Sequence, residues 1–397
     1  NSIQSTLCHC LQLIDRLAAL AAAELASESA ALEALSLADS ADPPPPPETV
    51  RARLPEKGVA VGLHRLLARA LEAAGETEAA AEVHLALAER LNQAGYWSAL
   101  ARAAEPLVAG HPREAAPLIA RARTQGGAAA VADDILEAAH AAFPRHGILA
   151  WRTCEARTAR GDASGASRAA ATALPELLED KNYELADEAL LLLAEDSGLP
   201  ALRALLAALT ILARQEAWSR FDAVLDLVAD ASAQARAADL SWPQVRELWL
   251  KHPERETLRR ASARILRVVL AGYPDPEALL RVSDLERASQ PAAVVLERLR
   301  RAMLFPPGYY ARHSGWGIGR IRENDTENLQ VDFPAKPLHR MTFATAEKAL
   351  EPLPAEDLRV LVAVDPARLE RLRREAPGDL VALALATLKG GEGSADD

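Results

Sequence analysis

Regular helical periodicity from about residue 58 to residue 303 restricts the fold of this chain more than any other feature does. Apolar residues recur there every three or four positions, first from Leu63 to Leu71 and again from Val83 to Leu91, with Gly75 as a turn between the two stripes. Each stripe covers one face of a helix, and that face has to be buried against a neighbour. The pattern therefore predicts an array of paired helices in a mostly α protein.

Two kinds of junction recur between the expected helices. Gly75-Glu76 and Gly161-Asp162 each combine a glycine that can end a helix with an acid that favours the start of the next one. A large ring followed by proline, which can also end one helix and start another, occurs at His111-Pro112, Phe143-Pro144, His252-Pro253 and Tyr273-Pro274. These junctions resemble those of tetratricopeptide repeats, although the two glycine turns lie 86 residues apart, which is not a multiple of the period of about 34 residues. We predict a degenerate, tetratricopeptide-like α-solenoid over residues 58–304.

Five consecutive prolines, Pro43 to Pro47, mark a boundary near the amino terminus. A polyproline run cannot continue an α-helix and forms a stiff, extended spacer. We interpret residues 42–57 as a linker rather than as a ligand for a proline-binding domain, because the run has no basic flank. The linker would separate an N-terminal helical segment, residues 1–41, from the array. Residues 305–353 and 354–397 are expected to form a small β module and a helical tail.

After residue 304 the helical periodicity of the sequence ends. A glycine-punctuated run from His313 to Ile321 belongs to a region with four short strand-like stretches, which are residues 309–313, 317–322, 329–333 and 338–343. Short antiparallel strands of this size close most easily as a small SH3-like or Tudor-like β-barrel. Gly315, Gly317 and Gly319 fit this prediction, because glycine permits positive φ and close backbone approach at a hairpin.

Four sequence blocks in this module carry a resemblance. They are Gly-Tyr-Tyr-Ala-Arg-His-Ser-Gly-Trp-Gly-Ile-Gly-Arg-Ile at 308–321, Val-Asp-Phe at 331–333, Leu-His-Arg-Met-Thr-Phe-Ala-Thr-Ala at 338–346 and Ala-Leu-Glu-Pro-Leu at 349–353. Together they resemble the amino-terminal extension of long Gre-type transcription elongation factors, over about residues 305–385. More loosely, they are similar to the RNA-polymerase-binding, Tudor-like modules of CarD-type regulators and of some repair helicases.

The resemblance implies a factor that docks on bacterial RNA polymerase through the β module, with the helical array as a protein-binding arm. The partner contacts would come from the first hairpin and neighbouring arginines: His313, Gly315, Trp316, Gly317, Gly319, Arg320 and Arg340. For Trp316 two roles stay open, a plug in the barrel and a contact with the partner. Gre-type factors also carry a coiled coil with an acidic tip and a compact C-terminal domain. Neither follows Leu388, so we expect no stimulation of transcript cleavage.

Charge and chemistry argue against several other classes of function. The net charge is −11, and residues 308–352 hold six basic and six acidic side chains, so nucleic-acid binding would be weak at most. The triplet Cys8-His9-Cys10 has no second Cys/His pair at zinc spacing, and Cys154 has no local signature of a catalytic thiol. We expect no metal, no cofactor and no enzymatic activity. An enzymatic role would have to reside in domains beyond Asp397.

Three cysteines are too few for a disulfide framework, and no stretch has the roughly 18 apolar residues of a membrane span. We therefore expect a cytoplasmic protein that does not contact membranes. The alternative to polymerase docking is a general tetratricopeptide-like scaffold that holds another protein or a peptide in the solenoid groove, with no role in transcription. An exposed cluster of Trp316, Arg320 and Arg340 would favour docking, and a buried Trp316 beside a polar, aromatic-lined groove would favour the scaffold.

Overall fold

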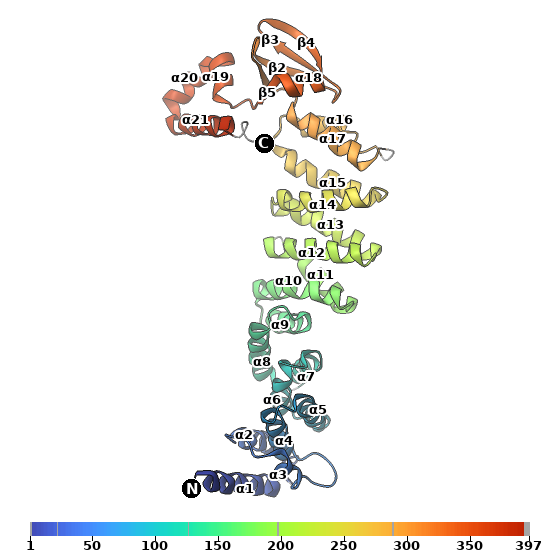
Figure 1. The fold of residues 1–397 in the computed structure, drawn as a ribbon, viewed down its shortest axis with the longest axis vertical. Helices are drawn as coiled ribbons and strands as arrows, with labels where there is room; N and C mark the ends of the chain where they lie inside the picture. Colours follow the sequence, from blue (N-terminus) through green and yellow to red (C-terminus); the bar gives the residue numbers. More distant parts are fainter. Residues whose placement is uncertain (1, 22, 126, 197, 288–289, 393–397) are drawn as a thin grey trace. The chain divides into compact units, whose positions relative to one another are not determined.

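The structure, a computed structural model, describes residues 2–21, 23–125, 127–196, 198–287 and 290–392 (Figure 1). Over these residues the protein is mostly α, with 21 α-helices and five strands that all lie between Tyr310 and Leu353. The chain divides into two compact units, Asn1–Val224 and Leu225–Asp397, and the division falls inside helix α13 (Trp218–Gln234). The predicted mostly α fold with a small β module near the carboxyl end is therefore confirmed.

The first unit is a succession of antiparallel helix pairs. Most helices pack on the next one along the chain, and several also pack on the next but one, as α7 does on α9 and α10 on α12. This pattern is typical of helical repeat arrays. The helices before α13 are α1 (Ser2–Leu20), α2 (Glu28–Asp39), α3 (Pro47–Arg51), α4 (Val61–Ala73), α5 (Thr77–Ala94), α6 (Trp97–Ala104), α7 (Pro112–Gln125), α8 (Ala129–Ala142), α9 (Gly147–Ala159), α10 (Ala163–Glu179), α11 (Tyr183–Ala194) and α12 (Leu199–Arg214).

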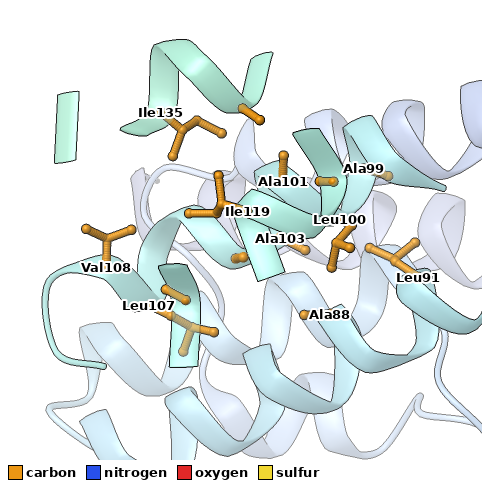
Figure 2. Packing of buried hydrophobic residues seen from close by; sticks show 14 of the residues in the cluster. Ala88, Leu91, Ala99, Leu100, Ala101, Ala103, Leu107, Val108, Ile119 and Ile135 are labelled. Atoms are coloured by element: carbon orange, nitrogen blue, oxygen red, sulfur yellow. The ribbon is translucent and has the colours of Figure 1, made fainter. Parts of the chain in front are cut away.

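Alanine allows these helices to approach closely. In α6 the residues Ala99, Ala101 and Ala103 are fully buried, and the larger side chains of Leu100 and Ile119 fill the space between α6 and its neighbours (Figure 2). A side chain with one methyl group has no rotamer freedom to lose and lets two helix backbones pack tightly. The alanine content of the sequence thus sets the close packing of the array.

The predicted junctions occur at helix ends. Gly75 and Gly161 have φ of +80° and +79°, the left-handed conformation that ends α4 and α9. Asp162 caps α10 by accepting a hydrogen bond from the Gly165 N–H at 2.9 Å, whereas the side chain of Glu76 caps nothing in α5. The two junctions therefore share a backbone turn but not a side-chain cap.

The proline run differs from the predicted free spacer. Pro46 has the expected extended backbone, but Pro47 is buried and begins helix α3, and Val50 in this helix is fully buried. Leu17 of α1 packs in the same core cluster as Val50 and Leu66 of α4. Helices α1 and α3 therefore pack on α4 in one hydrophobic core, and the N-terminal helices belong to the first unit.

A buried glutamate further ties the N-terminal helices to α4. The carboxylate of Glu24 accepts hydrogen bonds from the N–H groups of Val61 at 2.6 Å and Gly62 at 3.1 Å, in the first turn of α4. Burial raises the pKa of Glu24, although these two hydrogen bonds oppose the shift. This residue supplies the N-terminal cap that the sequence of α4 lacks.

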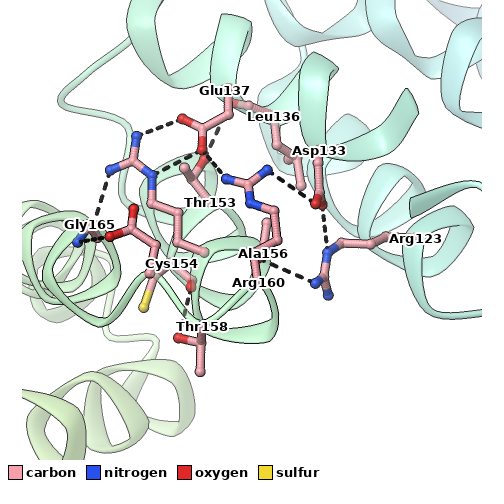
Figure 3. Close-up of polar contacts among 12 residues, drawn as sticks. Arg123, Asp133, Leu136, Glu137, Thr153, Cys154, Ala156, Thr158, Arg160 and Gly165 are labelled. Carbon is pink, nitrogen blue, oxygen red and sulfur yellow. Dashed lines mark hydrogen bonds and ion pairs between the residues drawn. The ribbon is translucent and has the colours of Figure 1, made fainter. Parts of the chain in front are cut away.

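An ion-pair network links α7, α8 and α9 (Figure 3). Asp133 is buried and accepts from Arg123 at 2.7 Å and Arg160 at 3.1 Å, and Glu137 accepts from Arg160 and Arg157, both at 2.6 Å. Hydrogen bonds from Arg157, then those from Arg160, lower the pKa of Glu137 to about 2. Each of the three arginines and two carboxylates has an oppositely charged partner, and these pairs join the three helices.

The second unit contains the last helices of the array, the sheet and a helical tail. After α13 its helices are α14 (Ala238–Lys251), α15 (Glu256–Val269), α16 (Pro276–Val282), α17 (Ala292–Leu304), α18 (Phe343–Ala349), α19 (Leu358–Val364), α20 (Pro366–Glu375) and α21 (Pro377–Glu392). Its strands are β1 (Tyr310–His313), β2 (Gly317–Asn324), β3 (Asn328–Phe333), β4 (Lys336–Thr342) and β5 (Leu350–Leu353). The four predicted strands are present, and β5 was not predicted as a strand.

The five strands form one antiparallel sheet in the order β4-β3-β2-β1-β5, so β4 and β5 are its edges. The seven residues of α18 carry the chain from one edge strand to the other, although a helix of that length spans only about 10 Å. Five flat strands would measure about 19 Å across. The sheet is therefore strongly curved, and α18 lies beside it (Figure 1). Phe343 and Ala346 of α18 belong to the core cluster of the sheet.

A buried asparagine fixes the sheet to α17. Asn324, at the end of β2, donates from Nδ2 to the carbonyl oxygens of Arg301 and Phe305, both at 3.0 Å. Its Oδ1 accepts a hydrogen bond from the Thr326 N–H at 2.8 Å. The ring of Phe305 is fully buried and meets Phe343 edge-on, with 5.8 Å between centroids. The sheet and α17 therefore share one core.

Candidate protein interface on the β module

Aromatic and basic side chains gather where the β1–β2 and β3–β4 hairpins meet. The ring of Trp316 stacks on His313, with 3.8 Å between centroids and an angle of 11°, and meets Phe333 edge-on at 5.6 Å. His339 lies 4.8 Å from the same ring, and the Lys336 ammonium lies 4.5 Å from the ring centroid. We call these five residues the aromatic corner.

The glycines of the first hairpin set the position of Trp316. The Gly315 N–H donates to Nδ1 of His313 at 3.0 Å, which orients the imidazole for stacking. Gly317 has φ of +77°, so the chain can turn there into β2. Trp316 packs against the core of the sheet and stays half-buried. Its ring therefore closes part of the core and leaves part of its surface accessible.

Gly319 belongs to the core rather than to the expected contact surface. It is buried in β2, and a Cβ at this position would lie 2.5 Å from Cδ1 of Phe333 and 2.8 Å from Cγ1 of Val331. The expectation of a partner contact at Gly319 is corrected on this point. The residue is glycine because two core side chains of β3 occupy the space above its Cα.

An exposed cluster of Trp316, Arg320 and Arg340 would have favoured docking, but the two arginines lie on a different face of the sheet from Trp316. In the register of β3 and β4, Val331 pairs with His339 on the core side, and Gln330 pairs with Arg340 on the opposite side. Successive residues of a strand point to opposite faces, so Arg340 lies away from the face that carries His339. Arg320 pairs with Asp332 across β2 and β3 and is likewise exposed on the outer face.

Most arginines on the outer face are neutralised by carboxylates. Arg340 pairs with Asp325 at 3.4 Å, and two similar pairs join Arg312 to Glu351 at 3.3 Å and Arg322 to Asp332 at 2.8 Å. Within the described residues, Arg320 forms no ion pair. This face therefore offers little net positive charge to a polyanion.

Leu338 breaks two local rules at the edge of the sheet. Its side chain is 58% exposed, and its backbone has φ of +47°. The left-handed conformation costs a residue with a Cβ about 1–2 kcal/mol, and Asn, Asp or Gly would adopt it more easily. The register of β3 and β4 is irregular between Val331 and Phe333, and the Leu338 N–H donates to Oδ1 of Asp332 at 3.4 Å, so the left-handed residue belongs to this irregular end of the hairpin.

The surroundings of His339 on β4 disfavour its protonation. Partial burial, then the nearby charges of Lys336 and His313, lower the pKa of His339. A neutral imidazole is an acceptor as well as a donor, and it presents an apolar face to Trp316. Lys336 and His339 were missed as site residues, because their contacts with Trp316 depend on the register of two hairpins. Leu338 was missed because neither its exposure nor its left-handed backbone can be read from the sequence.

The described residues offer little for other chemistry. They contain no group of three or more His, Cys, Asp or Glu side chains arranged to hold a metal ion, and the side chains of Cys8 and His9 lie outside them. Cys154 is buried, and desolvation raises its pKa to about 11, which suppresses the thiolate. None of the described helices combines the length and hydrophobicity that a bilayer crossing requires.

These features define a mostly α protein that carries a small antiparallel module with a partly accessible aromatic corner. Over 115 residues the chain is 32% identical to the transcription elongation factor GreA of Borreliella burgdorferi, a match that covers 29% of this chain and 12% of that protein. Over 116 residues it is 26% identical to a GreA-associated domains protein of Treponema pallidum, which covers 29% of this chain and 18% of that protein.

The chain thus spans less than a fifth of the length of either curated relative. No protein-family profile matches the chain. No solved structure matches it either. What the comparisons establish is a region related to proteins named for GreA, and this agrees with the resemblance noted in the sequence.

Proposed function

We propose that this chain is a noncatalytic transcription-associated factor region that docks on bacterial RNA polymerase through its β module. The observation that carries the proposal is the 32% identity to a protein named as a transcription elongation factor. In this proposal the docking surface consists of the aromatic corner and edge strand β4. The helical array acts as an additional protein-binding arm.

Strand β4 has the physical properties of a docking edge. An edge strand leaves backbone N–H and C=O groups unpaired on its outer side, and a strand of another protein can add there. Leu338 on this edge offers an exposed apolar side chain, and its β4 neighbours Lys336 and His339 contact the half-buried Trp316. This combination suits a protein strand with an apolar residue and an acidic residue.

A protein partner fits this module better than a nucleic acid does. Three outer-face arginines are paired with carboxylates of the module itself, and binding to phosphates would have to break these pairs. Residues 308–352 carry no net charge. Weak and strongly salt-dependent nucleic-acid binding is the most that such a surface supports.

The second candidate function is a general protein scaffold without a role in transcription. A groove of about 580 Å³ between α14 and α17 favours it, because a groove of this kind can hold a peptide whatever the β module does. The two candidates differ in whether loss of the aromatic corner removes polymerase binding.

A pull-down with purified bacterial RNA polymerase tests the proposal. It should use the full chain, because Asn324 and Phe305 join the sheet to α17 and a fragment starting at residue 305 would lose this support. Leu338→Asp and Trp316→Ala are the test variants, with circular dichroism as the folding check. Asp tolerates the left-handed backbone at 338, so the first variant keeps the fold.

Leu191→Asp is the matched control, since Leu191 is 73% exposed on α11, far along the sequence from the sheet. We expect both test variants to lose polymerase binding by at least about tenfold and the control to keep it. Equal polymerase binding by all variants would show that the aromatic corner and β4 are not the docking surface. No binding by the unmodified chain would leave the scaffold as the better account.

A further inference from the structure

The groove between α14 and α17 lies wholly in the second unit. Its volume is about 580 Å³, and most of its walls are apolar. The larger side chains that form it are Trp242, Leu250, Leu296, Met303 and Leu304, with Arg246, Glu297 and Arg300 among them. Several of these side chains are exposed or half-buried, so the groove is an open channel rather than a closed pocket for a small molecule.

The walls have the spacing of two helix faces. Trp242, Arg246 and Leu250 stand four residues apart on α14, and Leu296, Arg300 and Met303 stand four and three apart on α17. On each helix, these three wall residues are an apolar residue, an arginine and a second apolar residue, in that order. Leu250 is 42% exposed and adds an accessible apolar side chain to the open side of the groove.

One positive charge in the groove lacks a counter-ion. The carboxylate of Glu297 accepts from Arg300 and Arg301, both at 2.9 Å, and these hydrogen bonds lower its pKa to about 2. Arg300 also pairs with Glu347 of α18 at 3.0 Å. Arg246 has neither an ion pair nor a hydrogen-bond partner among the described residues. The groove therefore presents an uncompensated cation between apolar side chains, on a chain whose net charge is −11.

We propose that this groove binds an amphipathic helical segment of a partner protein, with apolar side chains toward the groove and a carboxylate opposite Arg246. An apolar helix face fits an apolar groove with anchors at positions i, i+3 or i+4, and i+7. The acidic residue follows from charge complementarity, because Arg246 is the wall cation left free. This inference rests on the proposed function, in which the helical array is a protein-binding arm. It places the binding site of that arm in the groove and states the chemistry of the segment bound there.

A charge-swap experiment tests the proposal directly. The probe is a fluorescein-labelled helical peptide of about 16 residues with one leucine-rich face and a single glutamate beside it, and its twin carries lysine in place of the glutamate. Fluorescence anisotropy against the full chain measures both. We expect the acidic probe to bind the unmodified chain about tenfold more tightly than its lysine twin.

Arg246→Glu should reverse this preference, and Leu250→Asp should weaken both probes. Arg203→Glu makes the same change of charge at an exposed position on α12 in the first unit, and it should leave both affinities unchanged. The proposal is overturned if neither probe binds, if Arg246→Glu weakens both probes equally, or if Arg203→Glu has the same effect as Arg246→Glu.

Failure here is separable from failure of polymerase docking. Arg246→Glu should retain RNA polymerase in the pull-down, because the aromatic corner and β4 are unchanged. A chain that loses the peptide probe but keeps polymerase supports two distinct surfaces. A chain that keeps polymerase and never binds a probe overturns the groove proposal alone.

Discussion

Three glycines within five residues of the first hairpin should respond differently to the same substitution with alanine. At Gly315 an added Cβ would lie 3.8 Å from the His313 ring, an ordinary contact, and the backbone is outside the left-handed region. At Gly317 there is open space, but φ is +77°. At Gly319 the backbone conformation is permissive, but Phe333 and Val331 occupy the space.

The expected costs follow from these three situations. Gly315→Ala should be neutral or stabilise by up to about 1 kcal/mol, because it restricts the unfolded chain. Gly317→Ala should cost about 1–2 kcal/mol for the left-handed conformation. Gly319→Ala should cost about 3 kcal/mol, the upper end for overpacking, because its two neighbours are 0% and 1% exposed and have little room to move.

Hydrogen–deuterium exchange of the β2 and β3 amides in the full chain measures these free energies locally. It is preferable to a global melt, because a chain with two units need not unfold in one step. A cost of about 3 kcal/mol corresponds to exchange that is roughly 150-fold faster, and about 1 kcal/mol to roughly fivefold. Phe333→Leu should partly rescue Gly319→Ala by removing the ring edge that meets the new methyl group.

Equal effects of Gly315→Ala and Gly319→Ala would refute this reasoning. A double variant in which Phe333→Leu simply adds its own cost would do the same. Either result would show that the close approach of Phe333 and Val331 to β2 is not the reason why residue 319 is glycine.

Three further predictions concern Glu137, Asn324 and Cys154. Glu137→Gln should destabilise the first unit by about 1 kcal/mol at pH 7, measured by urea unfolding, since Arg157 and Arg160 lose their carboxylate. The folded-state pKa of Glu137 is about 2, below its ordinary value of 4.5. Its contribution is therefore complete above about pH 4.5 and is lost as the pH falls toward 2, a dependence that the glutamine variant should lack in acid titrations followed by circular dichroism. Asn324→Ala should cost about 2 kcal/mol and speed proteolysis between α17 and β1, whereas Asn328→Ala, which loses one exposed 3.4 Å hydrogen bond, should not. Cys154 should react with iodoacetamide at pH 8 only after unfolding in urea, because it is buried and its pKa is about 11; fast labelling of the folded chain would contradict this.

Much of the fold was predictable because it depends on local periodicity. The helical spacing from Leu63 to Leu91 and the left-handed glycines at 75 and 161 gave the correct class and the correct helix ends. Four of the five strands were found from their alternation. Strand β5 was missed because its four residues include Pro352 and follow a helix, and its pairing with β1 is visible only in three dimensions.

The aromatic corner was predictable only in part, because strand register cannot be read from one strand at a time. His313 and Trp316 share a hairpin, and their rings stack in the structure. The docking hypothesis grouped Arg340 with Trp316, and the pairing of Val331 with His339 places Arg340 on the other face of the sheet. Without a strand register, the sequence could not show which of Arg340 and His339 shares the face of Trp316.

The hydrogen bonds of Asn324 have a consequence for how the second unit could work. Helix α17 forms one wall of the groove through Leu296 and Arg300, and its end is held to β2 by this asparagine. The α17 wall of the groove and the sheet are therefore joined by buried hydrogen bonds within one compact unit. Such a connection would restrict the spacing and orientation of the two partners that we propose for the groove and for the β module.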